Sequence, residues 1–118
     1  MDRIMLVSKI HRAVAQDVNL DYEGSITIDE EILVAADILP YQQVQVYNFS
    51  TGARFETYAL AGEAGSGKIV VNGAAARLVH RGDRLIIAAY ALLEDGRAAD
   101  HKPKVVLLDE QNRIKATL

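Results

Sequence analysis

One segment of the chain places an arginine and a tyrosine on the same side of an expected strand. In the run from Arg54 to Tyr58 alternate residues share a face, so these two residues lie about 13 Å apart at their Cα atoms. An arginine holds a carboxylate through two parallel hydrogen bonds, and a tyrosine hydroxyl can deliver a proton. The pair suits a small acidic substrate, although a solvated arginine beside a packed tyrosine is the simpler interpretation. Thr57 points to the opposite face and would serve another task.

A second group of residues could receive a carboxylate through backbone atoms. Asn72-Gly73 is the residue pair that a type I′ hairpin turn prefers. If a helix begins here instead, the N–H groups of Gly73, Ala74 and Ala75 are free at its first turn, and their small side chains let a carboxylate approach. From the residues alone, both interpretations stay open.

Two further polar segments carry little information by themselves. Lys9 and His11 are two residues apart and share one face of an expected strand, as is typical of a polar outer surface. The segment from Tyr22 to Gly24-Ser25 has the composition of an ordinary turn. Neither segment would indicate a special function in isolation.

The run from Gly62 to Lys68 fits the first seven places of the phosphate-binding loop G-x-x-x-x-G-K-[ST]. The next residue is Ile69, where that loop needs a serine or threonine for magnesium. The residues from Ile69 to Val71 also continue as a strand, where a helix should receive the phosphates. We therefore interpret the run as a glycine-rich hairpin turn.

The elements that must position these residues are mostly strands. Apolar stretches that predict strands run over Ile4 to Val7, Val44 to Phe49, Phe55 to Ala61, Ile69 to Val71, Leu85 to Leu92 and Val105 to Leu108. One helix is expected to begin at Asp29 as N-cap and to end before Pro40, and a second covers Ala74 to Val79. After each helix a tight polar connection leads into a strand, a faint internal repeat that suits a closed barrel of two interleaved halves.

Length and composition bound the function classes. A chain of 118 residues, half of them hydrophobic and 25% charged, fits one domain with one core. A net charge of -3 disfavours a nucleic-acid binder, and no apolar run is long enough for a membrane-spanning helix. The first residues begin no signal peptide, so we expect a cytoplasmic protein. The chain has no cysteine, and its three histidines show no metal-ligand spacing, so no metal site is expected.

Several of these segments, in this order and at this spacing, resemble the aspartate 1-decarboxylase family over essentially the whole chain. The matching stretches are Met5-Leu6, Ser8-Lys9-Ile10-His11-Arg12, Asn19-Leu20-Asp21-Tyr22-Glu23-Gly24-Ser25, Gly52-Ala53-Arg54-Phe55-Glu56-Thr57-Tyr58, Val71-Asn72-Gly73-Ala74-Ala75-Ala76-Arg77, and Gly82-Asp83 leading into Ile86-Ile87-Ala88. No position that the family uses for chemistry departs from its pattern. The segment after Leu93 contributes little to the resemblance.

The resemblance implies a mainly β fold, a double-psi β-barrel with short helices, as a single domain over residues 1–118. It also implies an inactive precursor in which the Ser25 hydroxyl attacks the Gly24 carbonyl and the chain breaks between them. The products are a short chain, residues 1–24, and a longer chain, residues 25–118, that begins with a pyruvoyl group derived from Ser25. That covalent group replaces pyridoxal phosphate, forms a Schiff base with L-aspartate and yields β-alanine and carbon dioxide for pantothenate biosynthesis.

The resemblance also assigns roles to residues. Tyr58 protonates the carbanion, and Arg54 with Lys9 holds the carboxylate that survives. Thr57 polarises the Gly24 carbonyl during processing and lies at the substrate site.

The remaining assignments concern the surroundings of the site. Asn72 and the backbone of Gly73, Ala74 and Ala75 position the substrate, while His11 and Tyr22 shape the processing and binding site. Family members are homotetramers with active sites at subunit contacts.

Two other functions stay open at this point. The same chemistry could act on another acidic amino acid such as glutamate, because a single methylene is worth only about 1 to 3 kcal/mol of discrimination. Alternatively, the chain could be a non-catalytic β-barrel binding module with Gly24-Ser25 intact. The sequence leaves open whether maturation needs a helper protein.

Overall fold

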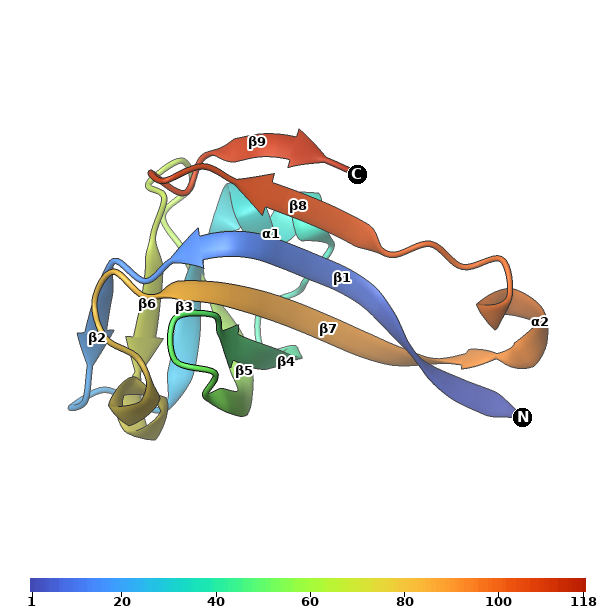
Figure 1. Cartoon of the computed structure of the whole chain (residues 1–118), viewed down its shortest axis with the longest axis horizontal. Helices are drawn as coiled ribbons and strands as arrows, with labels where there is room; N and C mark the ends of the chain where they lie inside the picture. The colour runs from blue at the N-terminus through green and yellow to red at the C-terminus, as the bar shows by residue number, and fades with distance from the viewer.

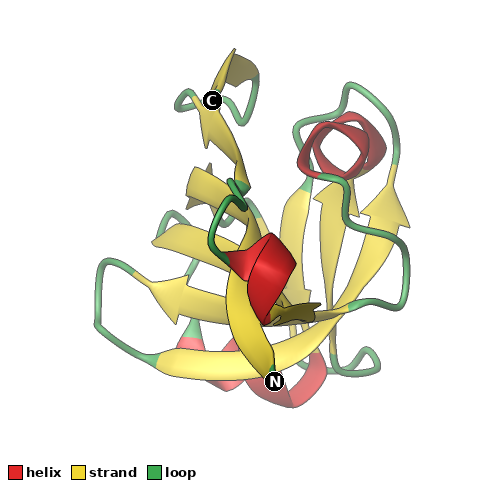
Figure 2. Ribbon diagram, turned by 90° about the vertical axis from the view of Figure 1, so that its right-hand side faces the viewer, coloured by secondary structure: helices red, strands yellow, loops and turns green.

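The computed structural model describes residues 1–118 and consists of a nine-stranded sheet with short helices at its margins (Figures 1 and 2). The elements are β1 (Asp2–Val14), β2 (Asp17–Asn19), β3 (Ser25–Asp29), α1 (Glu30–Ala36), β4 (Gln43–Asn48), β5 (Arg54–Gly62), β6 (Ile69–Asn72), the 3₁₀ helix η1 (Gly73–Leu78), β7 (Arg84–Glu94), α2 (Asp95–Ala98), β8 (Lys104–Leu108) and β9 (Ile114–Thr117). The strands are ordered β2-β6-β3-β5-β4-β7-β1-β8-β9. The mainly β class with short helices is confirmed.

Strands β1 and β7 form a long antiparallel pair that extends away from the rest of the molecule (Figure 1). At the far end of this pair the N-terminus lies beside α2, where Arg3 Nε is 2.7 Å from Asp95 Oδ1. The apolar pattern predicted β1 over Ile4 to Val7, and Lys9 and His11 were expected to share a strand face as well. Strand β1 continues to Val14 because β7 on one side and β8 on the other satisfy its backbone, including the polar residues after Val7.

Strand β3 organises the other half of the sheet. It pairs in parallel with β5 and antiparallel with β6, so it lies between two strands that follow each other in the chain. The glycine-rich run between β5 and β6 is therefore a crossover loop, and its prediction as a hairpin turn was wrong. The backbone N–H groups of Gly65 and Gly67 donate to the two carboxylate oxygens of Asp29 over 3.0 and 2.8 Å. The loop thus binds a carboxylate of its own chain.

Helix α1 begins where the sequence predicts. Asp29 is its N-cap, and Asp29 Oδ1 accepts a hydrogen bond from Glu31 N over 2.8 Å. The helix ends at Asp37, which has a left-handed backbone with φ of 57°. Ile32, Leu33 and Ala36 are buried, so α1 covers the core on one side.

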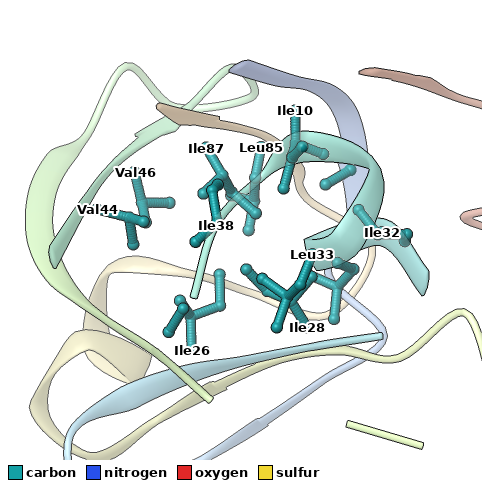
Figure 3. Packing of buried hydrophobic residues seen from close by; sticks show 14 of the residues in the cluster. Ile10, Ile26, Ile28, Ile32, Leu33, Ile38, Val44, Val46, Leu85 and Ile87 are labelled. Atoms are coloured by element: carbon teal, nitrogen blue, oxygen red, sulfur yellow. The ribbon is translucent and has the colours of Figure 1, made fainter. Parts of the chain in front are cut away.

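The core consists of 20 buried hydrophobic residues that come from most of the strands and from α1. Figure 3 shows side chains of α1, including Leu33, converging with strand residues such as Ile26, Ile28 and Ile87 on the same space. Along β4 the buried residues alternate with outward-facing ones, because successive residues of a strand point to opposite faces. The outer faces of β4, β5 and β7 therefore remain available to carry polar side chains.

The barrel predicted from the internal repeat is consistent with this arrangement, but the ladder of paired strands ends at β2 and β9, which do not pair with each other. Outside the ladder, the Gln16 N–H donates to Ile69 O over 2.9 Å and links the end of β1 to β6. The second helix lies close to its predicted place but is a 3₁₀ helix. None of the helices has the length and apolar character needed to cross a membrane.

Candidate active site

The Gly24–Ser25 bond joins an exposed turn to a buried strand. Gly24 is exposed, whereas Ser25 opens β3 with no exposed surface. Ser25 Oγ donates to Glu23 O over 3.3 Å and accepts a hydrogen bond from Asn72 Nδ2 over 3.1 Å. The hydroxyl is thus fixed next to the peptide bond by one neighbour in sequence and one from β6.

Asn72 holds two hydroxyl groups of β3. It ends β6, is 4% exposed, and pairs with Ser25 in the antiparallel ladder. Besides Ser25 Oγ, Asn72 Nδ2 lies 3.1 Å from Thr27 Oγ1 and donates to it. The hairpin-turn interpretation of Asn72-Gly73 is wrong, because η1 begins at Gly73 and no strand returns antiparallel to β6 from this point.

Gly73 approaches the expected cleavage site more closely than any side chain would allow. Its φ is +67°, and a Cβ atom built on it would lie 2.5 Å from both Gly24 Cα and Gly24 N, and 2.8 Å from Tyr22 O. A residue with a side chain would have to displace the backbone before Ser25. The next residues are small, with Ala74 exposed and Ala75 partly buried against the core.

Strand β5 lies directly beside β3, and its register relates two predicted residues to the cleavage site. The parallel pairing sets Ile26 opposite Ala59. Continued one residue earlier, this register sets Tyr58 beside Ser25, the first residue of β3, with neighbouring strands about 4.8 Å apart. Thr57 precedes Tyr58 in β5 and points to the opposite face. The Tyr58 ring is half-buried and stacks on the Tyr41 ring, with centroids 6.5 Å apart.

Arg54 begins β5 on the same face as Tyr58. Its guanidinium carbon lies 3.8 Å from the centre of the Tyr47 ring, and the side chain takes part in no ion pair within the chain. The nearest carboxylate along the same face, Glu56, instead accepts hydrogen bonds from the side-chain amides of Gln43 and Gln45, each over 2.9 Å. The positive charge of Arg54 is therefore available to a ligand.

Lys9 and His11 are far from Ser25 in the order of the strands. They belong to β1, which is separated from β3 by β7, β4 and β5, a span of about 19 Å along the sheet at four strand spacings. Tyr22 is 57% exposed and points away from the core. Within the chain, the Ser25 side chain is hydrogen-bonded to Glu23 and Asn72 and not to Lys9 or His11.

His11 has an unusual environment for a histidine, on a strand that is paired on both sides. Its Nδ1 atom is buried without a hydrogen-bond partner, and it lines a small cavity with Arg12, Phe49 and Arg84. Burial lowers the pKa of His11, and the positive charges of Lys9 and Arg12 lower it further. The imidazole is therefore held in its neutral form over most of the physiological pH range.

The sequence interpretation missed a pair of tyrosines next to Arg54. Tyr47 Oη and Tyr90 Oη lie 2.8 Å apart and share a hydrogen bond. The alternation of Gln43, Gln45 and Tyr47 along an otherwise apolar strand was a usable signal for a polar outer face. Nothing local indicated Tyr90, because its contact to Tyr47 depends on the pairing of β4 with β7.

Comparison with known proteins gives a consistent result. A sequence model of the family described as aspartate decarboxylase matches residues 1–115. Proteins named aspartate 1-decarboxylase are similar over nearly the whole chain. The one from Syntrophobacter fumaroxidans is 60% identical over 96% of this chain and 91% of its own length. That from Thermoanaerobacter pseudethanolicus is 56% identical, covering 96% and 97%, and that from Bacillus subtilis is 50% identical, covering 100% and 93%. The chain belongs to the aspartate decarboxylase family.

Proposed function

We propose that this chain is an aspartate 1-decarboxylase that converts L-aspartate to β-alanine and carbon dioxide and so serves pantothenate biosynthesis. Membership of the family supports the reaction, since three relatives with this name share 50 to 60% of its residues. The same names favour aspartate over glutamate as the substrate. They also favour an enzyme over the non-catalytic binding module that the sequence left open.

The first step is self-cleavage between Gly24 and Ser25. Ser25 Oγ attacks the Gly24 carbonyl carbon, and the Gly24–Ser25 amide becomes an ester. Elimination then breaks the bond between Cβ and Oγ of Ser25, which leaves a carboxylate at Gly24. Hydrolysis releases ammonia and leaves a pyruvoyl terminus on residues 25–118. The observation that carries this proposal is the buried Ser25 hydroxyl, bonded to Asn72 and directly adjacent to the Gly24 peptide.

The surroundings of Ser25 fit a pyruvoyl group. The group is small and uncharged, and the hydrogen-bond partners of Ser25 Oγ are a side-chain amide and a backbone carbonyl rather than a charged side chain. Asn72 and Thr27 are the polar side chains that would hold it. Once formed, the group supplies the electron sink that allows a carboxylate to leave as carbon dioxide.

Tyr58 and Thr57 serve separate steps in this proposal. Tyr58 shares the face of Ser25 in the β3–β5 register and protonates the substrate carbon after carbon dioxide has left. Thr57 precedes Tyr58 in β5 and polarises the Gly24 carbonyl during cleavage. The stacking of Tyr41 on the Tyr58 ring restricts the directions in which the Tyr58 hydroxyl can point.

Arg54 and Lys9 bind the carboxylate that is not lost. Arg54 has no carboxylate partner of its own in the chain, which favours this role. Because β1 and β3 are four strands apart, we propose that Lys9 and His11 reach the site from a neighbouring subunit of a homotetramer. Tyr22 and His11 then line the processing and binding site at that contact.

The remaining assignments complete the proposal. Asn72 and the backbone of Gly73, Ala74 and Ala75 border the substrate beside Ser25. We place the enzyme in the cytoplasm, in line with the lack of a membrane-spanning helix.

Release of carbon dioxide from labelled amino acids tests the reaction. The purified protein, incubated until cleavage is complete, should release carbon dioxide from L-aspartate and form β-alanine. Release from L-glutamate should be slower by about tenfold or more. One additional methylene in the substrate changes the discrimination of a pocket by about 10- to 200-fold. Equal rates on both amino acids would overturn the assignment to aspartate. No release from either amino acid by fully cleaved protein would overturn the proposed reaction.

A further inference from the structure

The outer face of β4, β5 and β7 contains an arginine whose position depends on its neighbours. Arg54 is exposed, and a long exposed arginine side chain loses conformational freedom when it is fixed. Its guanidinium nevertheless lies 3.8 Å from the centre of the Tyr47 ring. That distance is well within the range of about 6 Å for an attractive cation–π contact. Tyr47 is therefore a platform for the guanidinium.

Tyr47 is itself held in place by a residue of β7, the strand next to β4. In the ladder Tyr47 lies opposite Ile86, while Tyr90 is four residues further along β7. The two tyrosine side chains lean toward each other over Ala88, which is 1% exposed, and their hydroxyl oxygens lie 2.8 Å apart. The hydrogen bond to Tyr47 is the main reason why the pKa of Tyr90 is raised, with burial adding to it. The Tyr90 hydroxyl thus stays protonated and bonded to Tyr47 at neutral pH.

Glu56 is the carboxylate that could pair with Arg54 on this face, but other side chains bind it. Glu56 follows Arg54 by two residues on the same strand and face, a distance at which an ion pair between them would be expected. Gln43 and Gln45 both donate to Glu56 Oε2. The guanidinium of Arg54 therefore forms no ion pair with Glu56 and can bind the carboxylate of a ligand.

We propose that Tyr90 is a positioning residue for Arg54, which it orients through the hydroxyl and ring of Tyr47, so that the guanidinium is set in advance for the substrate carboxylate. This inference rests on the proposed role of Arg54 in aspartate binding. It extends that function to two residues that take no part in the chemistry. A guanidinium that is already oriented loses less conformational entropy when it binds a carboxylate. Tyr90 should therefore affect the affinity for the substrate and not the rate of the chemical step.

The test compares Tyr90→Phe with Leu92→Ala in the cleaved enzyme. Tyr90→Phe removes only the hydroxyl that bonds Tyr47. Leu92 lies two residues further along the same strand and is 65% exposed, so its truncation controls for a general disturbance of this face. Tyr90→Phe should raise KM for aspartate by about three- to tenfold, as expected for one lost hydrogen bond, with kcat unchanged. Leu92→Ala should leave both constants unchanged.

Arg54→Ala provides the decisive comparison. If Tyr90 acts through Arg54, adding Tyr90→Phe to Arg54→Ala should raise KM no further. An equal additional rise in the double variant would show that Tyr90 acts independently and would overturn the inference. An unchanged KM in Tyr90→Phe would also overturn it. A fall in kcat at constant KM would assign Tyr90 to the chemical step and likewise contradict the proposal.

Binding of succinate separates this inference from the proposed function. Succinate has both carboxylates of aspartate but no amine, so its affinity can be measured by titration calorimetry without turnover. Succinate affinity that falls in Arg54→Ala and, to a smaller degree, in Tyr90→Phe supports the inference even if the enzyme fails to decarboxylate aspartate. Succinate affinity that does not depend on Arg54 overturns the inference, whereas carbon dioxide release from aspartate by the wild-type protein would still support the proposed function.

Discussion

The side-chain amide of Asn72 donates a hydrogen bond to Ser25 Oγ over 3.1 Å, across the pairing of β6 with β3. This bond leaves the lone pairs of Ser25 Oγ only partly occupied and directs the hydroxyl hydrogen toward Glu23 O. The nucleophile proposed for self-cleavage is thus oriented by a residue 47 positions away in the chain.

Replacing Asn72 with alanine should slow self-cleavage. The variant loses the donor to both Ser25 Oγ, which is buried, and Thr27 Oγ1, which is partly buried, so both hydroxyls lose this partner. We expect a loss of about 1 to 3 kcal/mol in the free energy of unfolding of the uncleaved chain. The rate of cleavage is measured by denaturing electrophoresis over time. Cleavage of Asn72→Ala at the wild-type rate would remove Asn72 from the processing step.

Replacing Gly73 with alanine should destabilise the uncleaved chain by more than its positive φ explains. The left-handed backbone alone costs about 1 to 2 kcal/mol for a residue with a Cβ atom. At Gly73 that atom would also lie 2.5 Å from the backbone of Gly24. Gly82 is a matched control, because its φ is +92° but a Cβ atom there would meet nothing within 4 Å.

Urea unfolding of the two glycine variants at one protein concentration measures the difference. Gly73→Ala should lose clearly more unfolding free energy than Gly82→Ala, and it should cleave abnormally because Gly24 has moved. Equal losses in the two variants would mean that the close approach of Gly73 to Gly24 has no energetic consequence.

The stability of the chain should fall in mildly acidic solution because of His11. Burial and the charges of Lys9 and Arg12 lower the pKa of His11 in the folded state, whereas an unfolded chain has the ordinary value of about 6.5. Between these two values the unfolded chain binds more protons, so stability is full above about pH 6.5 and falls as the pH decreases through the lowered pKa. Thermal unfolding across this range measures the slope, and His11→Gln should flatten it. An unchanged slope in His11→Gln would assign the pH dependence to other groups.

Replacing Tyr58 with phenylalanine should separate cleavage from turnover. The ring and its stacking on Tyr41 remain, so the variant should fold and cleave normally. The proposed proton donor is absent, and kcat for aspartate should fall by about 100-fold or more. Cleavage is followed by mass spectrometry and turnover by release of carbon dioxide. A kcat close to that of the wild-type protein would exclude Tyr58 as the donor.

Several features of the fold could be predicted because they depend on local patterns. The cap at Asp29, with acidic residues after it, predicts the start of α1, and the apolar runs predict the positions of β4, β5, β6, β7 and β8. Strand β3 was not predicted. Its alternation spans only Ser25 to Asp29, and its place in the sheet depends on β5 and β6, which lie far along the chain. Nonlocal pairing of this kind leaves little trace in a short segment.

In the candidate site, too, some features follow from local sequence patterns and others from contacts between distant segments. The residue types at Arg54 and Tyr58 indicate acid-binding and proton-donating chemistry from spacing along one strand. The relation of Ser25 to Asn72, and of Gly24 to Gly73, arises only when β6 and η1 lie against the start of β3. These contacts involve glycine, alanine and asparagine, whose roles come from backbone geometry and hydrogen bonding rather than from a recognisable reactive group.

The mass of the purified chain under denaturing conditions tests the central claim most directly. Self-cleavage predicts two fragments, residues 1–24 and residues 25–118, with the second fragment lighter than its sequence by the change of an N-terminal serine to a pyruvoyl group. Ser25→Ala should give one intact mass under the same conditions. A wild-type chain that stays intact after prolonged incubation and yet decarboxylates aspartate would contradict the account, because the reaction would then require no group derived from Ser25.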